Sequence, residues 1–162
     1  GLQIAKALGA NVIITSSSNE KLKRAKDLGA DELINYKENA DWGSTAFQAA
    51  SGGVNLVIEI GGGSTFDQSM EALTIGGHIS LIGALGGVKT ELNLLQIVFK
   101  NMHTHGITVG SREDHEEMNR FLEEHQIHPV IGKEVAFEQG PDAIMGIAAG
   151  NHFGKIVINV NS

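Results

Sequence analysis

Three consecutive serines and a lysine follow a short apolar run near the beginning of the sequence. Ser16, Ser17 and Ser18 come directly after the run that ends at Thr15, and Lys21 follows closely. Serine hydroxyls and a lysine ammonium donate hydrogen bonds, so this group of side chains suits a phosphate. Tyr36 can add its phenol from a later segment. A serine N-cap followed by a solvated lysine is typical of the same pattern, and both interpretations stay open.

Three consecutive glycines, Gly61 to Gly63, follow a second apolar run. Beyond the carboxyl end of a parallel strand, missing side chains let the backbone approach a ligand in the crevice of an open sheet. A tight turn between a strand and a helix would use the same residues. The sequence has no intact G-x-G-x-x-G fingerprint, because neither these glycines nor Gly83, Gly86 and Gly87 have its spacing.

Residue types exclude several kinds of catalytic and metal chemistry. Cysteine is absent, which excludes disulfides, thiolate nucleophiles and cysteine-ligated zinc within this sequence. The seven histidines form no H-E-x-x-H or comparable pattern, so we expect surface or capping roles for them. The one tyrosine, Tyr36, is followed four residues later by Ala40, which excludes a Tyr-x-x-x-Lys pair. Glu59 lies inside an apolar run, where a carboxylate needs hydrogen-bond partners, and it can face the crevice or cap backbone amides; we assign it no catalytic role.

The composition is that of one globular domain with an acidic balance. The 162 residues include 41% hydrophobic residues, and the formal net charge is -7. No stretch gathers lysine and arginine into an extended patch, which argues against nucleic acid and anionic membranes as partners. No apolar run is long enough to span a membrane and no secretory signal pattern is present, so we expect a cytoplasmic location.

The elements that must position these residues alternate between strands and helices. Apolar runs rich in β-branched residues predict strands, and helical spacing of apolar residues predicts helices. The expected strands are Asn11 to Thr15, Glu32 to Asn35, Asn55 to Ile60, His78 to Ile82, Gly106 to Val109, Glu134 to Phe137 and Lys155 to Val160. The expected helices are Gly1 to Gly9, Ser18 to Leu28, Ser44 to Ala50, Gly61 to Ile75, Leu92 to Lys100, Asp114 (as N-cap) to His125 and Pro141 to Ala149. Crossover connections of this length predict a doubly wound α/β fold, with helices on both faces of a parallel sheet.

Several segments together resemble the medium-chain dehydrogenase/reductase family, closest to zinc-type alcohol dehydrogenases and NADPH quinone oxidoreductases. The resemblance covers nearly the whole chain and depends on the order and spacing of the segments. They are Leu2 to Ala10, Thr15 to Leu22, Ala25 to Asp31, Gly77 to Gly83, Gly110 to Arg112 and His152 to Ile158.

The resemblance implies a Rossmann-type sheet that is truncated at its N-terminus. In the family, a strand and a glycine-rich turn come immediately before the helix that opens this sequence. With the strand order 3-2-1-4-5-6, the absent first strand leaves a gap between the second and fourth strands. We therefore expect residues 1–162 to be a single partial dinucleotide-binding domain and a fragment of a longer polypeptide.

The resemblance also implies which residues bind the cofactor. NADP is favoured over NAD, because the strand Asn11 to Thr15, which matches the family's second strand, is followed by serines and a lysine rather than by an acidic residue. Family members contact the 2′-phosphate with residues that match Ser17, Lys21 and Tyr36. They contact the nicotinamide with residues that match Gly83, Ala84 and Leu85. Near the nicotinamide and pyrophosphate they use the segments that match Gly110 to Arg112 and His152 to Lys155. The expected cofactor-binding residues are Ser16, Ser17, Lys21, Tyr36, Gly61, Gly62, Gly83, Ala84, Leu85, Gly110, Ser111, Arg112, His152, Gly154 and Lys155.

The function implied is hydride transfer between NADPH and an alcohol, carbonyl, quinone or activated alkene. The family places its catalytic residues and any zinc in a separate N-terminal domain, so we name no catalytic or metal residue and expect this chain alone to be inactive. A homodimer through the edge strand Gly106 to Val109 is a further expectation. Two alternatives are a non-catalytic nucleotide-binding or regulatory module of the same fold and a methyltransferase. The serines and lysine, in place of a ribose-binding acid, disfavour the methyltransferase.

Overall fold

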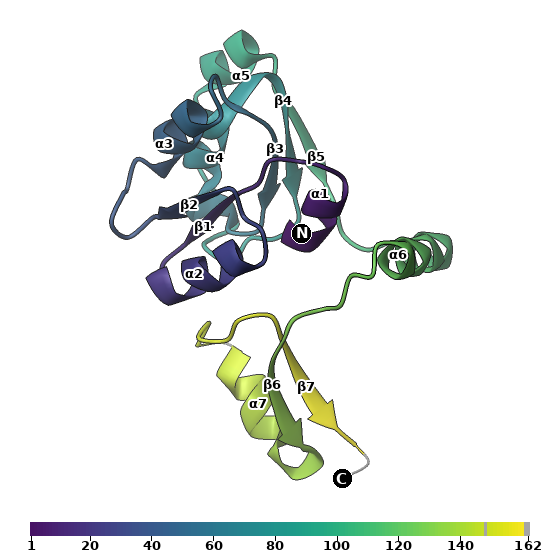
Figure 1. Ribbon diagram of the computed structural model, residues 1–162. Coiled ribbons are helices and arrows are strands. Elements are labelled where there is room, and N and C mark those ends of the chain that lie inside the picture. Colours follow the sequence, from purple (N-terminus) through teal and green to yellow (C-terminus); the bar gives the residue numbers. More distant parts are fainter. Residues whose placement is uncertain (148, 161–162) are drawn as a thin grey trace. The chain divides into compact units, whose positions relative to one another are not determined.

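The computed structural model describes residues 1–147 and 149–160, which fall into two compact units. The first unit comprises Gly1–Glu116 and the second Glu117–Ser162, with the division inside helix α6, Arg112–Glu124. Strands alternate with helices through both units, and every pairing between neighbouring strands is parallel (Figure 1). The chain is therefore an α/β protein with parallel sheets, as the sequence predicts.

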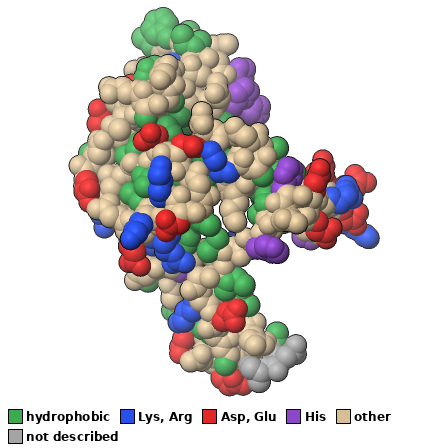
Figure 2. Space-filling view, viewed as in Figure 1, with side chains coloured by type: hydrophobic (Ala, Val, Ile, Leu, Met, Phe, Trp, Pro, Cys, Tyr) green, Lys and Arg blue, Asp and Glu red, His purple; other side chains and the backbone are tan. Residues whose placement is uncertain are grey.

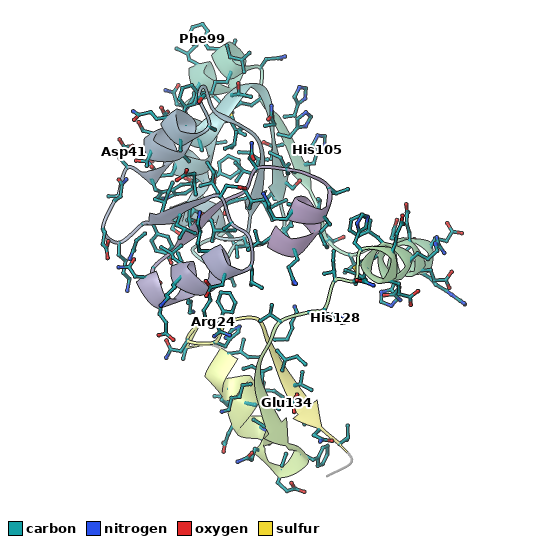
Figure 3. The ribbon with its side chains drawn as sticks, viewed as in Figure 1. Arg24, Asp41, Phe99, His105, His128 and Glu134 are labelled. Atoms are coloured by element: carbon teal, nitrogen blue, oxygen red, sulfur yellow. The ribbon has the colours of Figure 1, made fainter. Side chains whose placement is uncertain are left out.

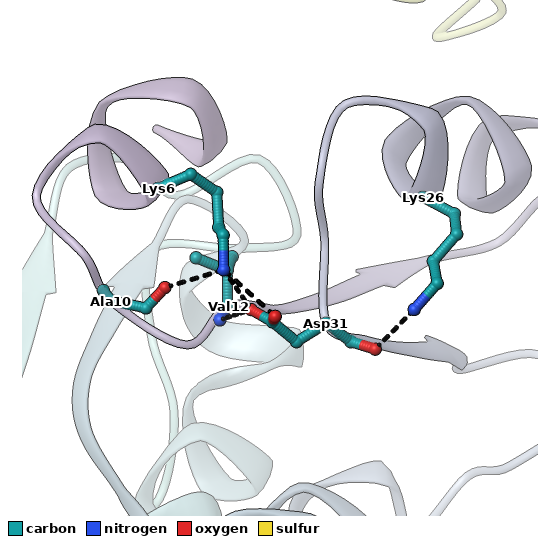
Figure 4. A network of polar contacts seen from close by, with 5 residues as sticks. All are labelled: Lys6, Ala10, Val12, Lys26 and Asp31. Carbon is teal, nitrogen blue, oxygen red and sulfur yellow. Dashed lines mark hydrogen bonds and ion pairs between the residues drawn. The ribbon is translucent and has the colours of Figure 1, made fainter.

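The first sheet pairs β1, Ile13–Ser16, with β2, Glu32–Asn35. Helix α1, Leu2–Ala7, precedes it, and α2, Asn19–Asp27, connects the two strands. Lys6 joins α1 to this sheet, since its Nζ lies 2.8 Å from Asp31 Oδ2, which also accepts from the Val12 amide at 2.7 Å (Figure 4). The hydrogen bond from Lys6, followed by that from Val12, holds the pKa of Asp31 below its usual range.

The second sheet has the order β3-β4-β5. Its strands are β3, Val54–Glu59, β4, Leu73–Leu81, and β5, His103–Gly106, and they are connected by η1, Gly62–Ser64, α4, Phe66–Ala72, and α5, Leu94–Lys100. Met70 and Leu73 are fully buried against Ile79 and Phe66, which forms the larger core of the unit. The hydrophobic free energy of burying these side chains holds α4 on the sheet.

Helix α3, Trp42–Ala49, connects the two sheets. Ala46 of α3 is buried with Ile34 of β2 and Ala72 of α4, and Val54 of β3 packs against them. Gly43 permits the close approach of α3 to α4, because its amide donates to Gln68 Oε1 at 2.8 Å and a Cβ there would lie 2.9 Å from the Glu71 Cβ. Among the described residues, β1 pairs only with β2 and β3 only with β4, which is the gap that the sequence predicts.

The second unit contains β6, Ile131–Ala136, η2, Phe137–Gln139, α7, Gly140–Ile147, and β7, Lys155–Asn159. The two strands are parallel neighbours and α7 connects them, with Val135 and Ala143 buried. Pro141 lies in the first turn of α7, where its missing N–H removes no helical hydrogen bond. The residue at position 148, within the predicted helix to Ala149, lies outside the described residues.

Several predicted elements have the wrong bounds: the strands predicted to begin at His78 and Glu134 begin at Leu73 and Ile131, and two further elements show the cause. The helix predicted from Gly61 to Ile75 ends at Ala72, because Leu73 begins β4 by pairing with Val54. The strand predicted at Gly106 to Val109 is instead β5, His103–Gly106, since its partner β4 ends at Leu81 and only the amide of Ile107 still reaches a β4 carbonyl. The residues that follow, up to Ser111, have no regular structure.

The N-cap predicted for α6 is also wrong by three residues. The Ser111 hydroxyl accepts from the Asp114 amide at 3.1 Å, and Asp114 Oδ2 accepts from the Ser111 amide at 2.6 Å. Ser111 is thus the cap, and Asp114 completes a reciprocal pair of bonds in the first turn. Hydrogen bonding to the carboxylate from the Ser111 amide, followed by that from the Ser111 side chain, lowers the pKa of Asp114 from its usual value.

Strand β3 is less buried than its apolar sequence predicts. Leu56 is 53% exposed and Ile58 54% exposed, whereas Val57 packs against the core below α4. Alternate residues of a strand point to opposite faces, and the described helices α3, α4 and α5 cover the face of Val57. No helix among the described residues is long and apolar enough to cross a membrane. On the face shown in Figure 2, acidic and basic side chains are interspersed.

Candidate functional site

The predicted phosphate-binding residues lie together at the carboxyl ends of β1 and β2. Ser16 ends β1 and pairs with Asn35 at the end of β2, and the Tyr36 amide donates to the Ser16 carbonyl at 3.1 Å. Ser17 follows β1, and Lys21 lies in the first turn of α2. Tyr36 is 42% exposed. The structure therefore places Ser16, Ser17 and Tyr36 at the same sheet edge as the first turn of α2, which carries Lys21.

Ser18 has the capping role that the alternative interpretation gave to the serines. Its side chain accepts from the Lys21 amide at 3.3 Å, and its own amide donates to Ser16 Oγ at 3.3 Å. The cap fixes the first turn of α2 directly after β1, with the positive end of the helix dipole at the strand terminus. Capping occupies Ser18 only, so it does not account for Ser17 or Tyr36.

A hydrogen-bonded cluster of Asn19, Asn35 and Glu38 lies beside these residues. Glu38 Oε1 accepts from Asn19 Nδ2 at 2.6 Å and from Asn35 Nδ2 at 3.0 Å, and Asn35 Nδ2 also donates to Asn19 Oδ1 at 2.8 Å. The cluster ties the segment after β2 to the beginning of α2. Sequence reasoning missed it, because an acidic residue after the second predicted strand, Glu32 to Asn35, does not indicate which element it will contact.

The glycines after β3 and β4 lie in two loops that pack backbone against backbone. The Gly63 amide donates to the Gly87 carbonyl at 2.7 Å, and the Gly86 amide donates to the Gly61 carbonyl at 2.6 Å. Gly62 has φ +70, and a Cβ on it would lie 2.7 Å from both Ala84 Cα and the Gly87 carbonyl oxygen. The close contact between the loops thus requires glycine at position 62, even if no ligand is bound. We call them the first glycine loop, 60–65, and the second glycine loop, 82–87.

Ala84 and Leu85, which the resemblance predicts to lie beside the nicotinamide, are in the second glycine loop. Leu85 is 87% exposed, and its amide donates to the Ile60 carbonyl at 3.1 Å. Gly83 lies close to the first loop, since a Cβ there would be 2.8 Å from the Ile60 carbonyl oxygen. The structure therefore brings together five predicted residues from the ends of two adjacent strands: Gly61, Gly62, Gly83, Ala84 and Leu85.

Glu59 provides the anchor for the first glycine loop. Its carboxylate is buried, and Oε1 accepts from the amides of Gly61 at 2.6 Å and Gly62 at 3.0 Å and from Thr65 Oγ1 at 2.7 Å. Oε2 accepts from the Ser69 hydroxyl of α4. The sequence predicted that Glu59 needs hydrogen-bond partners, with backbone amides among the candidates. It did not predict the hydrogen bond from Ser69 of α4.

The predicted residues Gly110, Ser111 and Arg112 lie at the beginning of α6 rather than at the end of a strand. Ser111 is engaged in the helix cap with Asp114. Arg112 Nε lies 2.7 Å from Glu116 Oε1, one helical turn on, and its side chain is 90% exposed. Such an exposed pair is worth little, so it leaves the guanidinium available for an anion.

The remaining predicted residues belong to the second unit. Gly154 has φ +75 and lies against Val130, the residue before β6, since a Cβ there would be 3.1 Å from Val130 Cγ1. The Lys155 amide donates to the Val130 carbonyl at 2.8 Å, and His152 is exposed. Gly154 therefore has a structural requirement of its own at the beginning of β7.

The histidines form no metal centre. His78, His103 and His105 lie on adjacent strands, with ring centroids of His78 and His103 4.6 Å apart and nearly parallel. His105 points away from the sheet in Figure 3. Within 1–147 and 149–160, no three histidine, aspartate or glutamate side chains could hold a metal ion. Since cysteine is also absent, the described residues do not fit a zinc site.

An open depression of about 600 Å³ lies apart from the predicted residues, between α3, α4 and α5. Lys100 borders it and donates to the carbonyls of Met70, Glu71 and Leu73 at the end of α4 at 2.7 to 2.9 Å. Burial lowers the pKa of Lys100, and the charge of Glu71 partly opposes this. Lys100 therefore stabilises the helix terminus, as cations do at helix C-termini.

Comparison with known proteins gives one family and many similar structures. The family model described as zinc-binding dehydrogenase matches residues 1–124. A zinc-type alcohol dehydrogenase-like protein of Schizosaccharomyces pombe is 41% identical over 99% of this chain and 48% of its own length. The crystal structure of a putative alcohol dehydrogenase from Sinorhizobium meliloti superposes with TM-score 0.91 at 38% identity, over 99% of this chain and 47% of that one. An NAD-dependent alcohol dehydrogenase structure gives TM-score 0.90 at 32% identity, over 99% and 47%.

Proposed function

Because the chain belongs to the zinc-binding dehydrogenase family, which is part of the medium-chain dehydrogenases and reductases, we propose that it binds NADP(H) for hydride transfer. It spans about half the length of the relatives it matches, 48% of the first. The substrate pocket and any zinc belong, on this proposal, to a catalytic domain outside this chain. The substrate is an alcohol, carbonyl, quinone or activated alkene.

The observation that carries the proposal is the group of donors at the carboxyl ends of β1 and β2. Ser16, Ser17, Lys21 and Tyr36 lie where a doubly wound sheet binds the adenosine end of a dinucleotide. Hydroxyls and an ammonium group complement a 2′-phosphate, whereas a carboxylate would repel it. The nearby carboxylate of Glu38 already accepts hydrogen bonds from two amide groups.

NADH is the competing cofactor, since one solved relative is an NAD-dependent alcohol dehydrogenase. If the Glu38 carboxylate turned from its two amide partners to a ribose, it would favour that cofactor. The amide contacts of 2.6 and 3.0 Å oppose such a turn. They support the assignment of Lys21 and Ser17, rather than Glu38, as the residues that select the cofactor.

The chain's residues bind and orient the cofactor rather than react. When bound, the nicotinamide would donate the hydride to a carbonyl, quinone or activated alkene, or accept it from an alcohol. On this proposal Ser17, Lys21 and Tyr36 hold the 2′-phosphate, the glycine loops lie along the nicotinamide end, and Arg112 neutralises pyrophosphate charge. Acid, base and metal come from the catalytic domain. A cytoplasmic location and a homodimer complete the proposal; the β5 edge that would pair begins at His103 rather than at Gly106.

The proposal is tested by removing the charge of Lys21 in the natural protein that carries this chain. For Lys21→Ala we expect kcat/KM to fall about tenfold with NADPH, the cost of one hydrogen bond to a charged group, and to stay within about twofold with NADH. Lys23→Ala is the matched control, because Lys23 is an exposed residue of the same helix. Equal losses with both cofactors, or no loss with NADPH, would refute the assignment.

A further inference from the structure

Glu59 is a buried carboxylate at the end of an apolar strand, only 3% exposed. An isolated carboxylate in such a place costs several kcal/mol unless hydrogen bonds satisfy it. Here both oxygens accept, Oε1 from three donors and Oε2 from one. Two of the four groups are backbone amides and two are hydroxyls, and each can donate to a carboxylate oxygen.

The four donors come from the first glycine loop and from helix α4. Gly61, Gly62 and Thr65 belong to the loop, and Ser69 belongs to α4, whose core face is fully buried. Glu59 thus ties the loop to the buried face of α4. Because Gly61 and Gly62 give their amides to Glu59, these amides are not available as donors to a ligand.

The same residue also holds the beginning of the second glycine loop. The Glu59 carbonyl accepts from the Ile82 amide at 2.8 Å, and the Gly83 amide approaches it at 3.3 Å. The hydrogen bonds of Gly63 with Gly87 and of Gly86 with Gly61 then join the two loops directly. A change in the conformation of the first loop therefore displaces the second.

We infer that Glu59 is a positioning residue for the dinucleotide. It fixes both glycine loops in the one arrangement that fits the nicotinamide end of the cofactor. The loops then contact the cofactor without the amides of Gly61 and Gly62. The inference rests on the proposed function. It assigns Glu59 no part in proton or hydride transfer. Its effect is on the affinity for the cofactor through the conformation of residues 60–65 and 82–87.

The test compares Glu59→Gln and Glu59→Ala in the natural protein, with NADPH affinity and backbone amide hydrogen exchange as readouts. Glutamine keeps an acceptor for Gly61, Gly62 and Thr65, and its amide can donate to the Ser69 hydroxyl. We expect it to bind NADPH within about threefold of the wild type, whereas alanine weakens binding about tenfold or more. Alanine should also accelerate exchange in residues 60–65 and 82–87 selectively.

Two further variants keep the test decisive if Glu59→Ala does not fold. Thr65→Val removes one donor to Glu59 Oε1. It should weaken NADPH binding and accelerate exchange in the loops, each by less than Glu59→Ala does. Ser69→Ala removes the contact by which Glu59 reaches α4, so it should also accelerate exchange in both loops, by less than Glu59→Ala.

Three outcomes would overturn the inference, and a fourth would overturn the proposed function. Faster exchange in the loops with unchanged NADPH affinity would overturn the inference, as would a uniform rise of exchange across the unit. A Glu59→Gln protein as impaired as Glu59→Ala would do the same. If the wild type binds no dinucleotide, the proposed function fails, and the exchange measurement still decides whether Glu59 holds the two loops.

Discussion

Replacing Gly62 by alanine imposes two separate costs on the first glycine loop. The residue has φ +70, a conformation that is unfavourable for residues with a Cβ. The new methyl group would also lie 2.7 Å from Ala84 Cα and from the Gly87 carbonyl oxygen, so the loops must move apart. Both neighbours are backbone atoms, which cannot rotate away as the end of a flexible side chain can.

The size of the effect follows from these two terms. Left-handed backbone costs about 1–2 kcal/mol for alanine, and overpacking costs about 1–3 kcal/mol. Gly62→Ala should therefore lower the free energy of unfolding by about 2–5 kcal/mol. Alanine also reduces the entropy of the unfolded chain, which offsets about 0.4–1 kcal/mol.

Gly9→Ala is the matched control, because Gly9 has φ +79 and no heavy atom within 4 Å of a built Cβ. It carries the same backbone cost and the same unfolded-state gain, so the difference between the variants isolates the contact between the loops. Urea unfolding of the natural protein should place Gly62→Ala about 1–3 kcal/mol below Gly9→Ala. Equal stability of the two variants would refute the packing of the loops.

Three other substitutions test separate parts of the structure. Met70→Ala, at a fully buried position, should cost about 2–5 kcal/mol of unfolding free energy and Met70→Leu under about 1.5; equal losses in urea unfolding would contradict the core. Hydrogen bonds from Lys6 and Val12 depress the pKa of Asp31, so its stabilisation is present above the unfolded value near 3.8 and is lost as the pH falls through the lower folded value. The stability difference between wild type and Asp31→Asn should therefore vanish in acid, and a difference independent of pH would disprove the assignment. Ser111→Ala should cost α6 about 0.5–2 kcal/mol, seen as faster amide exchange in its first turn, and unchanged exchange would show that the cap is unimportant.

Local signals were enough for most of the strands. The run before Thr15 is short and β-branched and predicts β1, and Glu32–Asn35 has the predicted bounds of β2. The order of strands and helices then gives the parallel fold, because connections of this length cannot form hairpins. Even the separation of β1 from β3 follows from the family's strand order.

Strand ends depend on partners that are distant in the sequence. Ile107, Thr108 and Val109 are β-branched and favour a strand, yet β5 ends at Gly106 because β4 offers no partner beyond Leu81. Similarly, nothing local stops the helix at Ala72, and it is the pairing of Leu73 with Val54 that converts the next residues to a strand. Register is a property of the folded sheet, so a single segment does not contain it.

The candidate site divides in the same way. Ser17, Lys21 and Tyr36 could be chosen from their residue types and from the strands they follow, and their meeting at one sheet edge follows from the parallel pairing of β1 with β2. The partners of Glu59 could not be chosen, since Ser69 reaches it only after α4 packs on the sheet. The role of glycines 61 to 63 was ambiguous for the same reason. Side chains at Gly62 and Gly63 are excluded by backbone atoms of residues 84–89, which are distant in the sequence.

The most direct test of the account is calorimetric titration of the natural protein with NADPH and with NADH. We predict saturable binding of NADPH with a dissociation constant about tenfold lower than that of NADH, which corresponds to one hydrogen bond from Lys21 to a charged 2′-phosphate. Equal or tighter binding of NADH would contradict the assignment of Ser17, Lys21 and Tyr36, and binding of neither dinucleotide would contradict the proposed function itself.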